Sequence, residues 1–197
     1  MTKAAVFVSG SGTNFEALMS HQEDGSLDCE IVCLIADREN AYARERARNH
    51  SIPEFCYIQK NYPSKKEYET DILNKLKELD VDLIILSGYM RYIGQVLLEN
   101  YPGRIINIHP AWLPEFPGAH GIQDAFEAKV PQTGVTVHYV DEGVDTGPVI
   151  LQERVPIDPG WDLETLENHV HAKEYDLFWR AVNQAVSELT SKKTEDE

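Results

Sequence analysis

The chain has 197 residues, of which 42% are hydrophobic, and a formal net charge of −15. This length fits one domain with its own core, and no apolar run reaches the ~20 residues of a membrane-spanning helix. The charge argues against nucleic acid as a partner and repels anionic small molecules at long range, so a phosphate site would depend on local donors.

Apolar runs alternate with helical patterns through the first half of the chain. The first run, residues 4–8, predicts a buried strand and lacks the layout of a signal peptide, so we expect a cytoplasmic protein. Further strands are predicted at residues 31–36, 55–58, 83–86 and 104–108. Helices are predicted at residues 14–21, 42–49, 64–79 and 95–100, the third opened by a Ser64–Glu67 capping box. This alternation is typical of a mostly parallel sheet covered by helices.

The pattern changes after residue 109. A loop rich in proline and glycine leads to an alternating strand at 135–140, which could pair antiparallel with a strand at 149–155. A last helix is predicted from residue 163 to about 189. We therefore predict one α/β domain over residues 1–190, Rossmann-like, with helices on both faces of a mostly parallel sheet and an antiparallel C-terminal portion. The acidic residues 191–197 are expected to be a disordered tail.

A Ser-Gly-Ser-Gly loop, residues 9–12, follows the first predicted strand. Its glycines permit a tight turn and close backbone approach to an anion, and the N–H groups near Thr13 and Asn14 lie at the positive end of the next helix. No Gly-Lys-Ser/Thr of a P-loop follows, and Phe15 stands where a dinucleotide fingerprint has its third glycine. Asp37, after the second strand, could serve a ribose hydroxyl. The alternative is a plain tight turn.

Asn107, His109 and Asp145 form the second candidate site. The i, i+2 spacing of Asn107 and His109 points both side chains to one side of a strand end, where ligands bind in α/β sheets. Asp145 lies in a loop between two glycines, and beside His109 it would favour the charged imidazole. A structural Asn-His pair and a turn aspartate are the alternatives. An amide, an imidazole and a carboxylate can orient a carbonyl and move a proton, and together with the glycine loop they suggest an enzyme that transfers a small carbonyl group to a phosphorylated substrate.

No other cluster in the sequence predicts a metal or disulfide site. The cysteines have no paired framework and are expected to be small core residues: Cys29, Cys33 and Cys56. The other histidines of interest lack a metal-ligand spacing: His120, His138, His169 and His171. Three arginines are expected on a solvated helix face: Arg44, Arg46 and Arg48. Residues 90–92 could line a pocket for an aromatic ligand or form an ordinary loop.

With these residues in view, the chain resembles the phosphoribosylglycinamide formyltransferases, folate-dependent enzymes of purine biosynthesis, over about residues 3–185. The stretches that carry the resemblance are residues 9–14, 86–91, 105–110, 113–118 and 137–148. Asn-x-His-Pro with a later Asp-x-Gly-Pro is shared by the wider formyltransferase superfamily. The Ser-Gly-x-Gly-Ser/Thr-Asn loop points to this family within it.

The resemblance implies a role for each matching residue. Phosphoribosylglycinamide would be bound by Gly12, Thr13, Asn14 and Glu174. The folate site would be lined by Lys65, Met90, Arg91, Tyr92, Ile93, Asn107, Val140, Asp141 and Asp145. Asn107 would hydrogen-bond the formyl oxygen, His109 would act as the acid, and Asp145 would favour the charged form of His109.

Two positions depart from the family pattern. Lys65 stands where the family often has an arginine that contacts the folate tail, and lysine lacks the planar fork of arginine, so Lys66 could substitute. Tyr92 stands where an aliphatic side chain is common, which would alter the edge of the pocket. Trp112 and Trp179 match no position with a family role.

The implied reaction transfers the formyl group of 10-formyltetrahydrofolate, a cosubstrate, to the amine of 5-phosphoribosylglycinamide in de novo purine biosynthesis. It needs no metal and no covalent intermediate. The expected partners are small molecules, with no nucleic acid or membrane, and the expected assembly is a monomer or homodimer.

Three other functions would use part of the same residues. A methionyl-tRNA formyltransferase would share Asn107, His109 and Asp145 but would carry a further C-terminal domain and a basic surface for tRNA. A formyltetrahydrofolate hydrolase would share the same three residues but would carry an N-terminal regulatory domain and have little use for the phosphate loop. A non-catalytic nucleotide-binding module could use the glycine loop and Asp37 without the trio.

Overall fold

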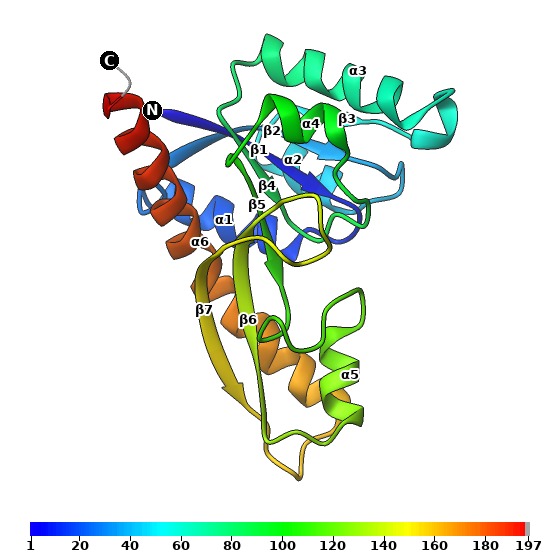
Figure 1. The fold of residues 1–197 in the computed structure, drawn as a ribbon, viewed down its shortest axis with the longest axis vertical. Helices are drawn as coiled ribbons and strands as arrows, with labels where there is room; N and C mark the ends of the chain where they lie inside the picture. The colour runs from blue at the N-terminus through cyan, green and yellow to red at the C-terminus, as the bar shows by residue number, and fades with distance from the viewer. Residues whose placement is uncertain (196–197) are drawn as a thin grey trace.

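The computed structural model of the protein describes residues 1–195. Its centre is a seven-stranded sheet with the order β3-β2-β1-β4-β5-β6-β7 (Figure 1). The strands are β1 (Thr2–Val8), β2 (Cys29–Ala36), β3 (Glu54–Cys56), β4 (Leu83–Leu86), β5 (Ile105–His109), β6 (Gln132–Tyr139) and β7 (Val149–Pro156). Strands β1 to β5 pair in parallel, whereas β6 is antiparallel to both β5 and β7. The predicted fold class, with its antiparallel C-terminal portion, is confirmed.

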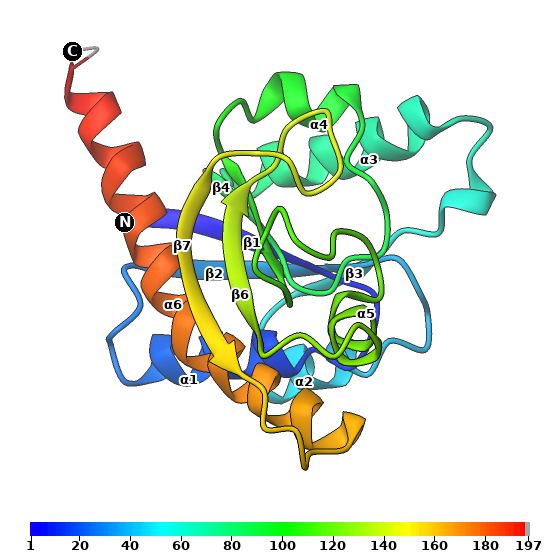
Figure 2. The same ribbon diagram turned by 60° about the horizontal axis from the view of Figure 1, so that its bottom comes forward.

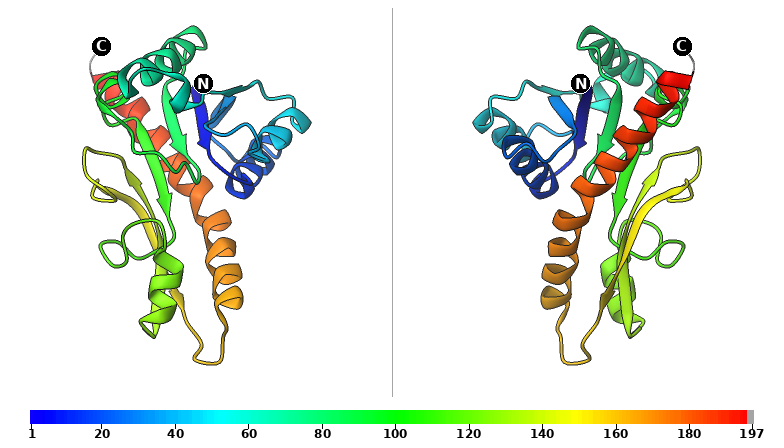
Figure 3. Two further views of the ribbon diagram at one scale, coloured as in Figure 1. Left: turned by 90° about the vertical axis from the view of Figure 1, so that its right-hand side faces the viewer. Right: turned by 90° about the vertical axis from the view of Figure 1, so that its left-hand side faces the viewer.

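Helices lie on both faces of this sheet (Figure 3). They are α1 (Thr13–Glu23), α2 (Ala43–Asn49), α3 (Lys65–Glu78), α4 (Gln95–Asn100), α5 (Gly121–Glu127) and α6 (Leu163–Glu195), with a 3₁₀ turn η1 (Gln59–Asn61). Strand alternation divides the core: Val6 packs with α1, α2 and α6, while Phe7 packs with α3 and α4. Over residues 1–195, none of the helices is both long and apolar enough to cross a membrane.

The start of α3 follows the predicted capping signal. Ser64 Oγ accepts a hydrogen bond from the Glu67 N–H at 3.2 Å, which satisfies one of the free donors of the first turn. The periodic side chains behind it are buried against the sheet: Tyr68, Ile72 and Leu76. Local capping and helical period therefore locate this helix correctly.

The last helix runs beyond the boundary expected at residue 190. It continues to Glu195, and Lys192 and Lys193 lie in its last turn, where the helix dipole favours cations. Lys193 Nζ also lies 2.9 Å from Asp82 Oδ1. Residues 191–195 of the expected disordered tail are thus helical, and residues 196–197 lie outside the described residues.

Two of the three cysteines pack as small core residues, as expected. Cys29 and Cys33 are buried in β2, and burial raises the pKa of each thiol to about 12, so both stay protonated. Cys56 is half-buried in β3, and all three thiols are free.

The strand order places a ligand-binding edge near the centre of the sheet. After β1, the chain adds β2 and β3 on one side, and it then adds β4 and β5 on the other. The crevice beyond the carboxyl ends of β1 and β4 is therefore a topological switch point, where open α/β sheets bind ligands. Two contacts join the loops there: Ser9 N–H to Gly88 O at 3.2 Å, and Met90 N–H to Ser9 Oγ at 2.8 Å.

Candidate active site

Asn107 and His109 share one face of β5. Ile105 packs in the core beneath α3 and α4, and Ile106 packs in the opposite core, so the residues with odd numbers point to the α3 and α4 side. His109 is the last residue of the strand and is buried, while Asn107 is half-buried. The i, i+2 spacing therefore brings an amide and an imidazole to the same side of this strand end.

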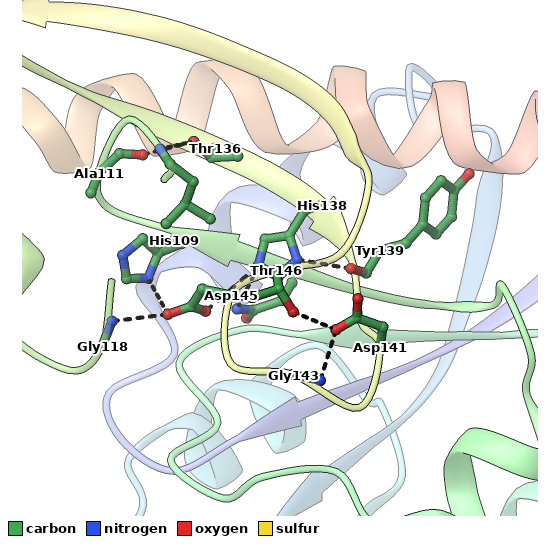
Figure 4. A network of polar contacts seen from close by, with 12 residues as sticks. His109, Ala111, Gly118, Thr136, His138, Tyr139, Asp141, Gly143, Asp145 and Thr146 are labelled. Carbon is green, nitrogen blue, oxygen red and sulfur yellow. Dashed lines mark hydrogen bonds and ion pairs between the residues drawn. The ribbon is translucent and has the colours of Figure 1, made fainter. Parts of the chain in front are cut away.

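Asp145 lies between two histidines (Figure 4). Its Oδ2 is 3.6 Å from His109 Nδ1, and its Oδ1 is 3.7 Å from His138 Nε2. The Gly118 N–H donates to Oδ2 at 3.0 Å. The sequence left the proximity of Asp145 to His109 open, and the structure brings the two together.

The environment of Asp145 favours its carboxylate. Burial opposes the charge, but His138, the Gly118 N–H and His109 outweigh that cost and lower the pKa below its ordinary value. The backbone of Asp145 has a φ of +54°, a left-handed conformation that aspartate tolerates better than most side chains. The turn thus presents a fixed negative charge to His109.

Both ring nitrogens of His109 face acceptors. Nε2 lies 3.0 Å from the Phe116 carbonyl oxygen, and Nδ1 faces the Asp145 carboxylate. A neutral imidazole can donate through only one nitrogen, whereas the cation donates through both. This geometry therefore presents both ring nitrogens to oxygen atoms, one on the Phe116 backbone and one on the Asp145 side chain.

His138 is the residue of this cluster that the sequence reasoning missed. The antiparallel register pairs Asn107 with His138, so their side chains lie side by side, with Asn107 Nδ2 3.4 Å from His138 Nε2. Its other nitrogen, Nδ1, lies 2.9 Å from the Tyr139 carbonyl oxygen. The signal was the alternation of residues 135–140, which places His138 on one face but does not say which strand lies beside it.

The loop after β6 carries Asp145 back over the sheet. The Val140 N–H bonds to Ile105 O at 2.9 Å, at the opposite end of β5 from His109. The loop then extends toward α4 before returning as β7 (Figure 2). Asp141 Oδ1 accepts hydrogen bonds from Gly143 N and Thr146 Oγ1, at 2.9 and 2.8 Å, and shapes the turn. The predicted folate residues Val140 and Asp141 therefore begin the loop that brings Asp145 to His109.

The glycine loop is built for close backbone approach. Gly12 precedes α1 with a φ of +73°, and a Cβ on it would lie 2.5 Å from the Ala43 Cβ. Among residues 1–195, no side chain caps the start of α1. The first-turn N–H groups around Thr13 and Asn14 are therefore open to an anion at the positive end of the helix.

Of the three arginines of α2 that the sequence placed on a solvated face, Arg48 is 58% exposed as expected, but Arg44 and Arg46 are not. Arg46 Nε donates to the Ser11 carbonyl oxygen at 2.7 Å, and Arg44 Nε pairs with Glu54 Oε2 at 2.7 Å. Their side chains are only 24% and 23% exposed. The prediction was wrong for these two because the loop and β3 bring partners that helical periodicity does not reveal. Arg46 in particular braces the glycine loop.

Asn14 and Glu174 meet although they belong to the first and last helices. Asn14 Nδ2 donates to Glu174 Oε2 at 3.0 Å, and Glu174 is buried. His171 Nδ1 lies 3.1 Å from the same oxygen; this hydrogen bond raises the pKa of His171 although burial acts in the opposite direction. No role was predicted for His171, although its i, i+3 spacing from Glu174 was a usable signal.

The predicted folate segment is an exposed rim. Met90 and Tyr92 have 60% and 71% of their surface exposed, while Ile93 packs against the core of α3 and α4. Lys65 Nζ donates to the Tyr92 carbonyl oxygen at 2.7 Å. Of the two candidate lysines, Lys65 thus reaches the segment.

Asp37 is not placed to serve a ribose. It is 2% exposed, and its Oδ2 lies 2.9 Å from Arg91 Nε. The sequence-based suggestion for Asp37 is therefore wrong, because the Asp37 carboxylate is buried against the side chain of Arg91, which comes from the loop after β4. Within residues 1–195, no group of three His, Cys, Asp or Glu side chains is arranged to hold a metal ion.

Comparisons with known proteins show which family the chain is similar to. The formyl transferase family model matches residues 2–182. Phosphoribosylglycinamide formyltransferase of Bacillus subtilis is 44% identical, with 93% of this chain and 94% of that protein aligned. The crystal structure of the Bacillus halodurans enzyme of the same name has a TM-score of 0.91 at 47% identity, covering 94% of this chain and 96% of the other.

A second solved structure gives the same result. Glycinamide ribonucleotide transformylase 1 from Geobacillus kaustophilus is 48% identical with a TM-score of 0.91, and the alignment covers 94% of this chain and 98% of the other. The match extends over the glycine loop, the end of β5 and the loop of Asp145. The chain therefore belongs to the formyl transferase family, among its phosphoribosylglycinamide formyltransferases.

Proposed function

We propose that the protein transfers the formyl group of 10-formyltetrahydrofolate to the amine of 5-phosphoribosylglycinamide, giving the N-formyl product and tetrahydrofolate in de novo purine biosynthesis. Family membership gives formyl transfer and implies a folate-type donor, and the names of the relatives indicate the acceptor. The observation that carries the proposal is the contact of Asp145 with His109, beside Asn107 at the end of β5.

Asn107 and His109 stabilise the charge that develops in the reaction. The amine attacks the formyl carbon, a C–N bond forms, and negative charge appears on the formyl oxygen. The Asn107 amide and the protonated His109 each donate a hydrogen bond to that oxygen. One such hydrogen bond typically lowers the activation barrier by about 3–4 kcal/mol. Collapse of the intermediate breaks the bond to N10 of the folate, and the proton lost by the amine is returned to N10, with His109 as the acid.

Asp145 keeps His109 in its working form. Its carboxylate stabilises the imidazolium and orients the ring, in the way that a carboxylate supports a catalytic histidine in other enzymes. To reach the substrate, His109 Nε2 exchanges its contact with the Phe116 carbonyl for the formyl oxygen. Removal of the Asp145 charge therefore acts on the reaction through His109.

Two sets of residues bind the substrates. Phosphoribosylglycinamide lies on Gly12, Thr13, Asn14 and Glu174, where the open N–H groups of α1 bind the phosphate despite the net charge of −15. The donor lies on Lys65, Met90, Arg91, Tyr92, Ile93, Asn107, Val140, Asp141 and Asp145. We further propose a cytoplasmic monomer or homodimer that acts on small molecules alone and uses no metal, nucleic acid or membrane.

A spectroscopic turnover assay tests this function. The purified protein is mixed with 10-formyltetrahydrofolate in the presence and absence of phosphoribosylglycinamide. The consumption of 10-formyltetrahydrofolate is monitored over time, and the products are identified. We expect donor consumption only when the amine is present. Consumption without it would identify a hydrolase, and no reaction in either case would show that the acceptor or donor is a different molecule.

A further inference from the structure

Asp37 and Arg91 form a buried ion pair at the carboxyl edge of the sheet. Asp37 follows β2 directly, and its side chain is 1% exposed. Arg91 Nε lies 2.9 Å from Asp37 Oδ2, at ion-pair distance but without the alignment of a hydrogen bond. Oδ1 of Asp37 is buried and has no hydrogen-bond partner in the described part of the chain. Arg91 is therefore the group that compensates this buried carboxylate.

The guanidinium of Arg91 is fixed from several sides. Nη1 donates to Gln59 Oε1 at 2.9 Å, and Cζ lies 6.0 Å from the centroid of the Tyr68 ring. The adjacent backbone is tied down because the Met90 N–H bonds to Ser9 Oγ at 2.8 Å. Nη2 makes no hydrogen bond among residues 1–195, so it is the nitrogen that remains available to a ligand.

The surroundings of Arg91 define the chemistry of such a ligand. Its neighbours Met90 and Tyr92 expose large apolar side chains, and Lys65 Nζ reaches the Tyr92 carbonyl oxygen. Two cations thus flank an exposed apolar rim in a protein of net charge −15. This composition suits a ligand with an aromatic body and carboxylates at one end. The proposed folate donor, with its benzoyl ring and glutamate tail, has that composition.

We propose that Asp37 is a positioning residue that holds Arg91 so that Nη2 binds a carboxylate on the glutamate tail of the formyl donor. The inference rests on the proposed function for the identity of that donor. Asp37 touches neither substrate and acts through Arg91, whose five donors can bridge a buried carboxylate on one edge and a ligand carboxylate on another. A buried acid at the end of β2 therefore sets affinity for a ligand that lies above β4.

The Asp37→Asn variant separates this role from a structural one, because asparagine keeps the shape of aspartate and removes its charge. Binding is measured by calorimetric titration with two probes: 10-formylfolate, and a truncated analogue whose benzoyl group ends in an uncharged amide. We expect the Kd of 10-formylfolate to rise about 10-fold, the effect of one charge-assisted hydrogen bond, with no change for the truncated analogue. In turnover, KM for the donor rises while kcat is unchanged.

Asp80→Asn is the matched control. Asp80 has 83% of its side chain exposed and lies between α3 and β4, so the same chemical change there should leave the Kd of both probes unaltered. Equal losses of affinity for both probes in Asp37→Asn, or no loss for either, would overturn the proposal.

A double-mutant cycle provides the second test. Arg91→Ala is expected to raise the Kd of 10-formylfolate, and adding Asp37→Asn should raise it no further, because Asp37 acts only through Arg91. Arg91→Ala should also lower Tm by leaving a buried carboxylate unpaired, and Asp37→Asn should restore part of that loss. Additive effects on Kd would contradict the proposal. Tail-dependent binding without formyl transfer would contradict only the proposed function, and failure of the unaltered protein to bind either probe would overturn both.

Discussion

Asp145 Oδ2 lies 3.6 Å from His109 Nδ1, while the other oxygen of the same carboxylate lies 3.7 Å from His138 Nε2. One negative charge is therefore shared by two imidazoles on neighbouring antiparallel strands, and the Gly118 N–H holds it in place. The two histidines are not equivalent, because His109 Nε2 lies 3.0 Å from the Phe116 carbonyl oxygen, whereas His138 Nδ1 lies 2.9 Å from the Tyr139 carbonyl oxygen.

His109→Ala should lower kcat by about 10²–10⁴-fold, the usual contribution of a positioned acid. Its Tm should also fall, because His109 is buried and is one of the two imidazoles beside the Asp145 carboxylate, but the loss of kcat should be far larger than this loss of stability can explain. The measurement is the rate of donor loss with both substrates saturating, together with thermal unfolding. His169→Ala, on the exposed side of α6, is the control and should retain full activity. A His109→Ala enzyme with near-normal turnover would remove His109 from the mechanism.

Asp145→Asn should reduce both turnover and stability, and the effect on stability should depend on pH. Because the folded state lowers the pKa of Asp145 below its ordinary value of 3.8, its charge stabilises the fold above that value. The contribution is lost as the pH falls through the lowered pKa. Urea denaturation should therefore give a lower free energy of unfolding for the variant than for the unaltered protein. This difference should be constant near neutral pH and should shrink below a pH of about 4. A difference independent of pH would mean that the charge of Asp145 is not what stabilises the fold.

Gly12→Ala should weaken binding of the phosphorylated substrate and destabilise the protein. A side chain at a φ of +73° costs about 1–2 kcal/mol, and the added Cβ would also meet Ala43 at 2.5 Å. Gly10→Ala is the matched control, since a Cβ there has nothing within 4 Å. KM for phosphoribosylglycinamide and urea unfolding should both change for Gly12→Ala and remain near the original values for Gly10→Ala. Equal behaviour of the two variants would rule out a special role for the Gly12 turn.

His50→Gln should destabilise the protein only at acidic and neutral pH. His50 bridges Glu16 and Glu23, each at 2.7 Å. Burial opposes the charge of the ring, but the two carboxylates prevail and raise its pKa above 6.5. Its stabilisation is full below pH 6.5 and is lost as the pH rises through the raised pKa. Because both carboxylates are partly solvated, we expect His50→Gln to lower the free energy of unfolding by at most about 1 kcal/mol, measured by denaturant titration. This loss should vanish at high pH.

Local signals in the sequence predicted the parts of the site that lie within one element. Strand alternation placed Asn107 and His109 on one face, and the capping box located the start of α3. The glycine loop was placed correctly at the start of α1 because only a few residue types permit its turn. Each of these features is fixed by the backbone geometry of neighbouring residues.

Contacts between elements were harder to predict. The contact of His138 with Asn107 depends on β6 pairing with β5, whereas the alternation suggested only its pairing with β7. Asp37 was assigned to a ribose because its place after β2 fits that role, but the loop carrying Arg91 covers it. Periodicity in the sequence predicts on which face of a helix or strand a side chain lies. It does not predict which side chain from a distant loop will contact it. The resemblance to a family supplied Glu174, whose partner on α1 no local pattern could indicate.

The hydrogen bond from Asn14 to Glu174 also bears on how the protein is made. It joins the first helix to the last, so a chain emerging from the ribosome carries the glycine loop long before the helix that completes its substrate site. Until α6 docks, the nascent chain has an anion-binding turn without the carboxylate that accompanies it. If Glu174 binds the substrate as proposed, tight binding therefore has to wait until α6 has been synthesised and has docked against α1.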